Sequence, residues 1–121
     1  MKKTDALGQF EQLVLTAVLA LRDQAYGVTI HAKVAELAER PVKIGSVYIT
    51  LDRLEDKRYL SSWLDDPTPE RGGRPKRYYK MLAAGERALR ESLDTARRIQ
   101  ETAEDSWRIW RWRPKTTSSN G

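Results

Sequence analysis

The first third of the chain carries two stretches of apolar residues at helical spacing. In the first, apolar side chains recur every three or four positions between Phe10 and Leu21, which predicts an amphipathic helix ending near Asp23. Gly27 interrupts this pattern, and a second periodic stretch follows until Pro41 closes it. The chain is therefore expected to begin with two short, closely linked helices.

A third helix is predicted over residues 45–57, ahead of a β-hairpin. Its apolar stripe consists of Ile44, Val47, Leu51 and Leu54. The opposite side is polar and charged except for Ile49, an apolar residue on an exposed face. Residues 59–66 alternate loosely as a strand, prolines frame the next loop, and residues 76–82 predict a second strand. The expected order is three helices and a hairpin.

Residues 83–113 return to helical spacing, with apolar steps that alternate between four and three. The seam consists of Leu89, Leu93, Ala96, Gln100, Ala103, Trp107 and Trp110. A helix of about 30 residues is about 45 Å long, too long to pack on so small a core. A partner helix is expected, most simply from a second copy about a two-fold axis. The chain thus divides into residues 1–82, a long helix over residues 83–113, and a tail over residues 114–121 that is expected to be disordered.

Composition fits this organisation. A length of 121 residues suits one domain with an extension, and 22 Lys and Arg against 17 Asp and Glu give a net charge of +5. The absence of cysteine excludes disulfides, thiolate zinc sites and thiol nucleophiles. The longest apolar run, residues 13–21, is far shorter than the roughly 20 residues of a membrane span. We therefore expect a cytoplasmic protein with no membrane partner.

Positive charge is concentrated in residues 71–80, which read Arg-Gly-Gly-Arg-Pro-Lys-Arg-Tyr-Tyr-Lys and contain no acid. The Gly-Gly turn and the β-prone tyrosines place these cations on a hairpin tip. Such a ribbon can neutralise backbone phosphates, so nucleic acid is the first candidate partner. A charge run is more often only a solvated face, and charge alone does not decide between the two.

Motifs of catalysis are missing from the sequence. There is no Gly-x-Ser-x-Gly, no His-Glu-x-x-His and no glycine-rich nucleotide fingerprint. The single histidine, His31, cannot build both a triad and a metal site. We therefore predict no catalytic residues, no metal site and no cofactor.

Three short motifs become specific once the element order is known. They are Ala25-Tyr26-Gly27-Val28-Thr29-Ile30, then Gly45-Ser46-Val47-Tyr48-Ile49-Thr50-Leu51-Asp52-Arg53-Leu54-Glu55, then Gly72-Gly73-Arg74-Pro75-Lys76-Arg77-Tyr78-Tyr79 followed by Gly85. Over about residues 7–93 the chain resembles the PadR family of bacterial transcriptional regulators, in the branch with a short, single C-terminal helix. The resemblance implies a mainly α (α+β) fold, a winged helix-turn-helix with a long C-terminal dimerisation helix. It also implies a homodimeric repressor that binds a pseudo-palindromic, double-stranded DNA operator.

Three positions depart from the family pattern. Lys43 stands where Ser is usual before the third helix, Arg58 where Gly usually follows it, and Leu82 where Thr usually opens the last helix. Two helix N-caps are lost, each worth about 1 kcal/mol. The departures affect stability and helix boundaries rather than the fold.

The third helix and its entry supply the first group of expected DNA contacts. These residues are Lys43, Ser46, Tyr48, Ile49, Thr50 and Arg53. Arg53 can bind guanine or phosphate, the hydroxyls can bind phosphate or base edges, and Ile49 can pack on a thymine methyl. Alternatives stay open: Arg53 can pair with a neighbouring aspartate, Tyr48 borders the buried stripe, and Lys43 can be merely solvated.

The hairpin supplies the second group, for phosphate or minor-groove contact. Its candidates are Arg71, Arg74, Lys76 and Arg77. Because Tyr78 and Tyr79 alternate faces of the strand, we expect one of them to pack on the core.

The last helix is expected to join two subunits. Its predicted dimerisation residues are Leu89, Leu93, Ala96, Ala103, Trp107 and Trp110. The family resemblance adds a hypothesis that Trp107 stacks on a small planar aromatic effector, although burial of Trp107 and Trp110 in the dimer interface explains them without a ligand. A winged-helix protein-interaction adaptor with little DNA binding is the alternative function.

Overall fold

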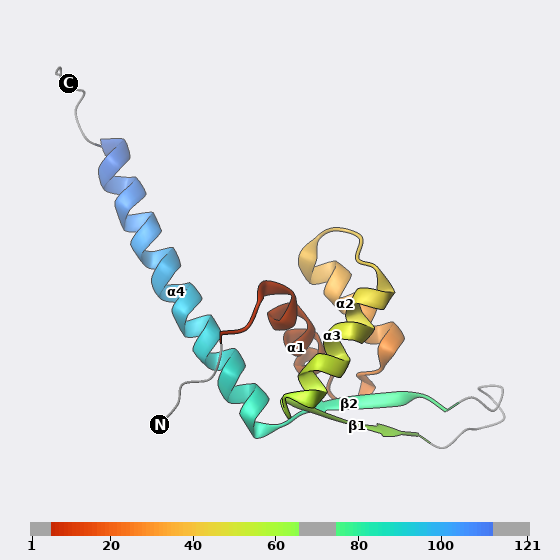
Figure 1. Cartoon of the computed structure of the whole chain (residues 1–121). Coiled ribbons are helices and arrows are strands. Elements are labelled where there is room, and N and C mark those ends of the chain that lie inside the picture. The colour runs from red at the N-terminus through yellow and green to blue at the C-terminus, as the bar shows by residue number, and fades with distance from the viewer. Residues whose placement is uncertain (1–5, 66–74, 113–121) are drawn as a thin grey trace.

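The computed structural model describes residues 6–65 and 75–112 (Figure 1). The elements are α1 (Gln9–Leu21), the 3-10 turn η1 (Arg22–Gln24), α2 (Gly27–Ala38), α3 (Ile44–Asp56), β1 (Leu60–Leu64), β2 (Arg77–Met81) and α4 (Ala83–Trp112). Helices α1 to α3 form a small body, from which the hairpin and α4 extend in different directions (Figure 1). The predicted mainly α fold with one hairpin and a long last helix is confirmed. The predicted tail, residues 114–121, lies outside the described residues.

The core is centred on the inner side of α3, which packs against α1 and α2. Val47, Leu51 and Leu54 have no exposed surface. They meet apolar residues of the two other helices, Val14, Leu15, Val18, Ile30 and Val34. The predicted stripe is wrong at Ile44, whose side chain is 43% exposed. This residue is the first of α3 and lies at the margin of the core.

The hairpin is an antiparallel pair whose register runs from Leu60 opposite Met81 to Leu64 opposite Arg77. The segment before α2 joins its edge, because the Tyr79 N–H donates to the Ala25 carbonyl at 2.9 Å. Tyr79 is buried, whereas Tyr78 lies on the other face and is half-buried. The prediction that one of the two tyrosines packs on the core is confirmed.

The turn after α3 sets the direction of the hairpin. The Arg58 N–H donates to the Glu55 carbonyl and the Tyr59 N–H to the Leu54 carbonyl, both at 2.9 Å, which is a Schellman C-cap. Arg58 has a φ of 64°, the left-handed conformation that glycine adopts at lowest cost. The family's usual glycine at this position therefore has a structural reason, and arginine accepts strain of about 1 kcal/mol.

Among the described residues, the buried positions of α4 all lie in its first turns. A Cβ at Gly85 would overlap the Tyr59 carbonyl oxygen, so this turn packs directly on the backbone that leaves α3. Ala88 and Leu89 are also buried. Leu89 therefore belongs to the core of the subunit, which corrects its assignment to a surface dimer seam. The exposed part of the seam begins at Leu93, which is 49% exposed.

A partly buried ion pair ties the start of α1 to the end of α3. Glu11 is 8% exposed. Its carboxylate accepts the Gly8 N–H at 3.0 Å and the Lys57 ammonium at 3.0 Å. Burial raises the pKa of Glu11, but the Gly8 N–H and the Lys57 charge together outweigh burial, so the pKa lies below its ordinary value of 4.5.

This lowered pKa predicts a loss of stability in acid. A carboxyl with a lower pKa in the folded state stabilises the protein above its unfolded pKa, and this contribution disappears as pH falls through the folded pKa. We expect the free energy of unfolding to fall as the pH drops below the ordinary carboxyl pKa of 4.5. Glu11→Gln should flatten this decline and lower stability at pH 7 by about 1–3 kcal/mol.

Urea denaturation at several pH values measures both effects. Glu36→Gln is the control, because Glu36 forms an exposed pair with Lys33 on one helix. A Glu11→Gln variant with the stability and pH dependence of the wild type would contradict this account of the ion pair.

Candidate nucleic-acid interface

The outer side of α3 is exposed along its whole length. Its exposed residues are Gly45, Ser46, Tyr48, Ile49, Asp52, Arg53 and Asp56. Ile49 is 61% exposed although it is apolar. Because the inner side of the helix is fixed in the core, these side chains face outward in one defined arrangement. Ser46, Ile49 and Arg53 lie three and four positions apart and so share one face.

Two expected contacts in α3 need correction or refinement. Thr50 is 5% exposed, because it follows the fully buried Val47 by three positions and turns toward the core. It is therefore removed from the candidate surface. Tyr48 is 43% exposed, and a Cβ at Gly27 would overlap its ring and hydroxyl. Its ring thus packs on the start of α2 while part of it stays accessible, so both interpretations of Tyr48 hold in part.

The start of α3 is the part best suited to approach an anion. Lys43 is the N-cap residue, is exposed, and makes no side-chain capping bond. The first N–H groups of a helix lack intrahelical partners and favour negative charge. Asp52 and Asp56 occupy the later turns, where they repel phosphate. The N-terminal half of α3 is therefore the half that fits a DNA backbone.

Arg53 is available for a ligand. It is exposed, and among the described residues it forms no ion pair with Asp52, Asp56 or any other carboxylate within 4.0 Å. The alternative, an ion pair between Arg53 and a neighbouring aspartate, is thus not formed in this structure.

The two predicted DNA-contacting cations of the hairpin that the structure describes, Lys76 and Arg77, both contact the protein itself. The Lys76 ammonium lies 4.1 Å from the centroid of the Tyr26 ring, a cation–π contact. The Arg77 guanidinium donates to the Ser62 hydroxyl at 2.9 Å. Arg71 and Arg74 lie outside the described residues.

An aromatic cluster, Tyr26, Tyr78 and Trp63, supports the same hairpin. The ring centroids of Tyr26 and Tyr78 are 5.3 Å apart, and those of Trp63 and Tyr78 are 5.9 Å apart. Sequence reasoning missed Tyr26 and Trp63. The alternation of the two strands was the available signal, since it places Trp63 and Tyr78 on one face once the register is known.

His31 holds the loop that leads into α3. Its Nε2 lies 2.6 Å from the Val42 carbonyl oxygen. A carbonyl only accepts, so this nitrogen carries a proton and donates. The contact fixes the chain one residue before Lys43 and so helps to position the start of α3. Within residues 6–65 and 75–112, no group of three or more His, Asp or Glu side chains is arranged to hold a metal ion.

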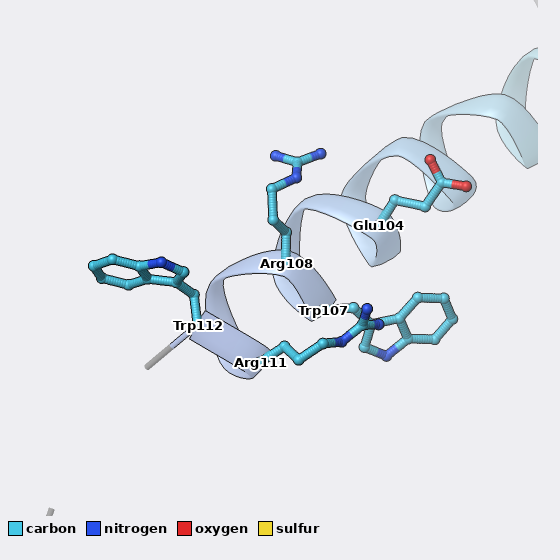
Figure 2. Close-up of a pocket in the computed structure, with 5 residues that line it drawn as sticks. All are labelled: Glu104, Trp107, Arg108, Arg111 and Trp112. Carbon is cyan, nitrogen blue, oxygen red and sulfur yellow. The ribbon is translucent and has the colours of Figure 1, made fainter. Parts of the chain in front are cut away.

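The far half of α4 exposes large apolar residues. Trp107 is 59% and Trp110 69% exposed. A shallow hollow near the end of the helix is lined by Glu104, Trp107, Arg108, Arg111 and Trp112. Figure 2 shows the Trp107 and Trp112 rings on different sides of the helix. No helix of the described part combines the length and the apolar character needed to cross a bilayer.

Helix α2 packs against α3, and a β-hairpin follows α3 in the chain. This arrangement defines a winged helix-turn-helix protein. The comparisons agree at family level. The model of the transcriptional regulator PadR-like family matches residues 15–91, more than half of the sequence. The chain belongs to this family. PadR-family proteins are DNA-binding transcriptional regulators rather than enzymes, and the predicted family is confirmed.

Three crystal structures illustrate the likeness. A PadR-like transcription factor from Bacteroides fragilis is 29% identical, with 81% of this chain and 89% of that chain covered and a TM-score of 0.65. A PadR-family regulator from Eggerthella lenta is 26% identical, with 79% and 81% covered and a TM-score of 0.64. One from Clostridium difficile shares the fold at 24% identity, with 83% and 99% covered and a TM-score of 0.66. Among curated proteins, no significant match is found.

Proposed function

We propose that this protein is a homodimeric repressor that binds a specific, pseudo-palindromic site on double-stranded DNA. The observation that carries the proposal is the outer side of α3, fixed by the core beneath it and flanked by a basic hairpin, in a chain of the PadR-like family. Residues 1–82 form the DNA-binding domain and residues 83–113 the dimerisation helix.

The chemistry of each group assigns its role. Ile49 packs on a thymine methyl, Ser46 binds a phosphate or a base edge, and Arg53 binds guanine or phosphate. Lys43 places its charge beside the backbone at the start of α3. The hairpin of residues 60–81, which we call the wing, contributes phosphate or minor-groove contacts through Arg71 and Arg74, and Lys76 follows them closely in the sequence. The helix therefore supplies base selectivity, and the wing supplies position and salt-dependent affinity.

These roles predict different responses to salt. Replacing a phosphate-contacting cation lowers the slope of log affinity against log salt by about 1. We expect this change for Arg74→Ala, and for Arg53→Ala if its partner is a phosphate. Ile49→Ala should leave the slope unchanged and weaken discrimination at one base pair by about 5-fold or more. Fluorescence anisotropy with a selected duplex at several salt concentrations measures both quantities.

Arg90→Ala is the control for general charge loss, because Arg90 lies on α4 and pairs with Glu86. Weak, sequence-blind duplex binding that none of these substitutions alters would instead support the protein-interaction adaptor.

Dimerisation rests on the apolar side of α4. The buried Gly85 and Ala88 and the exposed Leu93, Trp107 and Trp110 lie on one side of a single 30-residue helix. On that side, the buried residues all lie near the start of the helix. A second copy of the chain that covers the exposed rest of this side forms a dimer, and the dimer places its two α3 helices in successive major grooves, about 34 Å apart.

Charge placed on this side should separate the subunits. Leu93→Glu and Trp110→Glu are expected to yield monomers in sedimentation equilibrium and to weaken operator binding by about 100-fold or more, since one half-site remains. Ile109→Glu is the matched control, because Ile109 is equally exposed at 69% but lies about 100° around the helix from Trp110. Dimers that persist in both seam variants would contradict the assignment.

An effector site at Trp107 completes the proposal. Trp107 presents an accessible indole in a hollow that Arg108 and Arg111 also line, and Figure 2 shows the Arg111 side chain extending toward the indole. This is a surface on which a planar aromatic molecule can stack. A ligand that prefers one arrangement of the paired α4 helices shifts operator affinity by its coupling free energy, typically about 5- to 150-fold.

Titration of planar aromatic compounds against tryptophan fluorescence tests this site. Trp107→Ala should weaken binding by about 10-fold or more, whereas Trp63→Phe, in the hairpin, should leave it unchanged. Equal affinities of the wild type and Trp107→Ala would rule out the site.

A further inference from the structure

Three hydrogen-bonded side chains join α3 to both strands of the hairpin. Glu55 comes from the last turn of α3, Ser62 from the middle of β1, and Arg77 from the start of β2. The Ser62 hydroxyl donates to the Glu55 carboxylate at 2.7 Å. The Arg77 guanidinium donates to the same hydroxyl at 2.9 Å. We name these three residues the wing junction.

The wing junction lies where the hairpin leaves the core. Leu60, at the base of the hairpin, is 1% exposed, and Tyr79, opposite Ser62, is 3% exposed. Further out, Trp63 and Leu64 are 46% and 55% exposed. Within the described residues, Ser62 to Glu55 is the only side-chain hydrogen bond from α3 to either strand. The junction therefore limits the angle between the outer hairpin and α3.

The chemistry of the wing junction requires all three members. A serine hydroxyl has one proton to donate, and here Glu55 accepts it. The same oxygen accepts a hydrogen bond from Arg77. The neutral Ser62 hydroxyl therefore links the Glu55 carboxylate to the Arg77 guanidinium. A charged partner makes each of the two bonds stronger than a bond between neutral groups. Removing the hydroxyl breaks both bonds and leaves the net charge unchanged.

The residue opposite Ser62 in the ladder belongs to the same surroundings. Tyr79 is paired with Ser62 in the register. Burial raises the pKa of the Tyr79 hydroxyl, and the negative charges of Asp52 and Glu55 raise it further, whereas Arg77 lowers it. Charges of both signs, from α3 and from Arg77 of β2, thus act on this tyrosine.

We propose that Glu55 and Arg77 are positioning residues, which hold the wing at a fixed angle to α3 so that both elements meet one duplex together. This inference rests on the proposed DNA binding, and it replaces direct phosphate contact as the main role of Arg77. A wing without the junction must be ordered when DNA binds, and that ordering lowers the affinity.

Ser62→Ala is the direct test, because it removes both hydrogen bonds without removing a cation. We expect operator affinity to fall by about 3- to 10-fold, with the salt slope unchanged because no phosphate contact is lost. Ser62→Thr keeps a hydroxyl and should restore most of the affinity. Ser61→Ala is the matched control, since Ser61 is the neighbouring serine on the opposite face of β1 and makes no side-chain hydrogen bond within the described part.

Arg77→Ala separates positioning from phosphate contact. Under the proposal, Arg77→Ala weakens DNA binding but leaves the slope of log affinity against log salt unchanged. The double variant Ser62→Ala with Arg77→Ala should bind DNA no more weakly than whichever single variant binds it more weakly. A slope that falls by about 1, together with additive losses, would show that Arg77 contacts phosphate and would overturn the proposal. Thermal unfolding of each variant ensures that affinities are compared among folded proteins.

Hydrogen–deuterium exchange of the free protein keeps the two proposals distinguishable. The backbone amides of the outer hairpin should exchange faster in Ser62→Ala than in Ser61→Ala or the wild type. If the wild type binds no duplex selectively but this difference appears, the DNA-binding proposal fails and the wing junction stands as a structural link. Unchanged exchange and unchanged affinity in Ser62→Ala would overturn the inference.

Discussion

The burial of one side of α3 is the constraint on which the other features depend. Val47, Leu51 and Leu54 are fully buried against α1 and α2. A rotation of α3 by one residue, about 100°, would expose leucines and turn charged side chains inward, at a cost of several kcal/mol. The core therefore decides that Ser46, Ile49 and Arg53 face outward. It also sets where the chain leaves α3, and so where the hairpin and α4 begin.

Periodicity was sufficient to predict the elements, because each has an apolar side that must be buried. It also predicted that Tyr78 and Tyr79 lie on opposite faces of the hairpin, with one of them on the core, and that Ile49 is exposed. It was less successful at margins: Ile44 is at the end of its helix, Thr50 lies beside the buried stripe, and Leu89 belongs to the core rather than a seam. These errors arise because a helical wheel gives the direction of each side chain, but it does not show how far the neighbouring elements extend to cover that side chain.

Contacts between distant residues were beyond the reach of the sequence. The stacking of Lys76 on Tyr26 joins residues 50 positions apart, and the wing junction depends on the exact register of β1 and β2. A basic run therefore indicated a DNA-binding surface, but not which of its cations are already engaged within the protein. The family match ends at residue 91, so the exposed aromatic part of α4 lies outside it. The family model thus covers most of the body and the start of α4.

The central claim is that two copies of α3 and the wing bind one symmetric DNA site. Selection of bound fragments from random duplex, followed by footprinting of the selected sequence, tests this claim most directly. The account predicts a two-fold-symmetric footprint with half-site centres about one helical turn, or 34 Å, apart or a multiple of that distance. A pool in which no sequence is enriched, or a single asymmetric footprint, would contradict it.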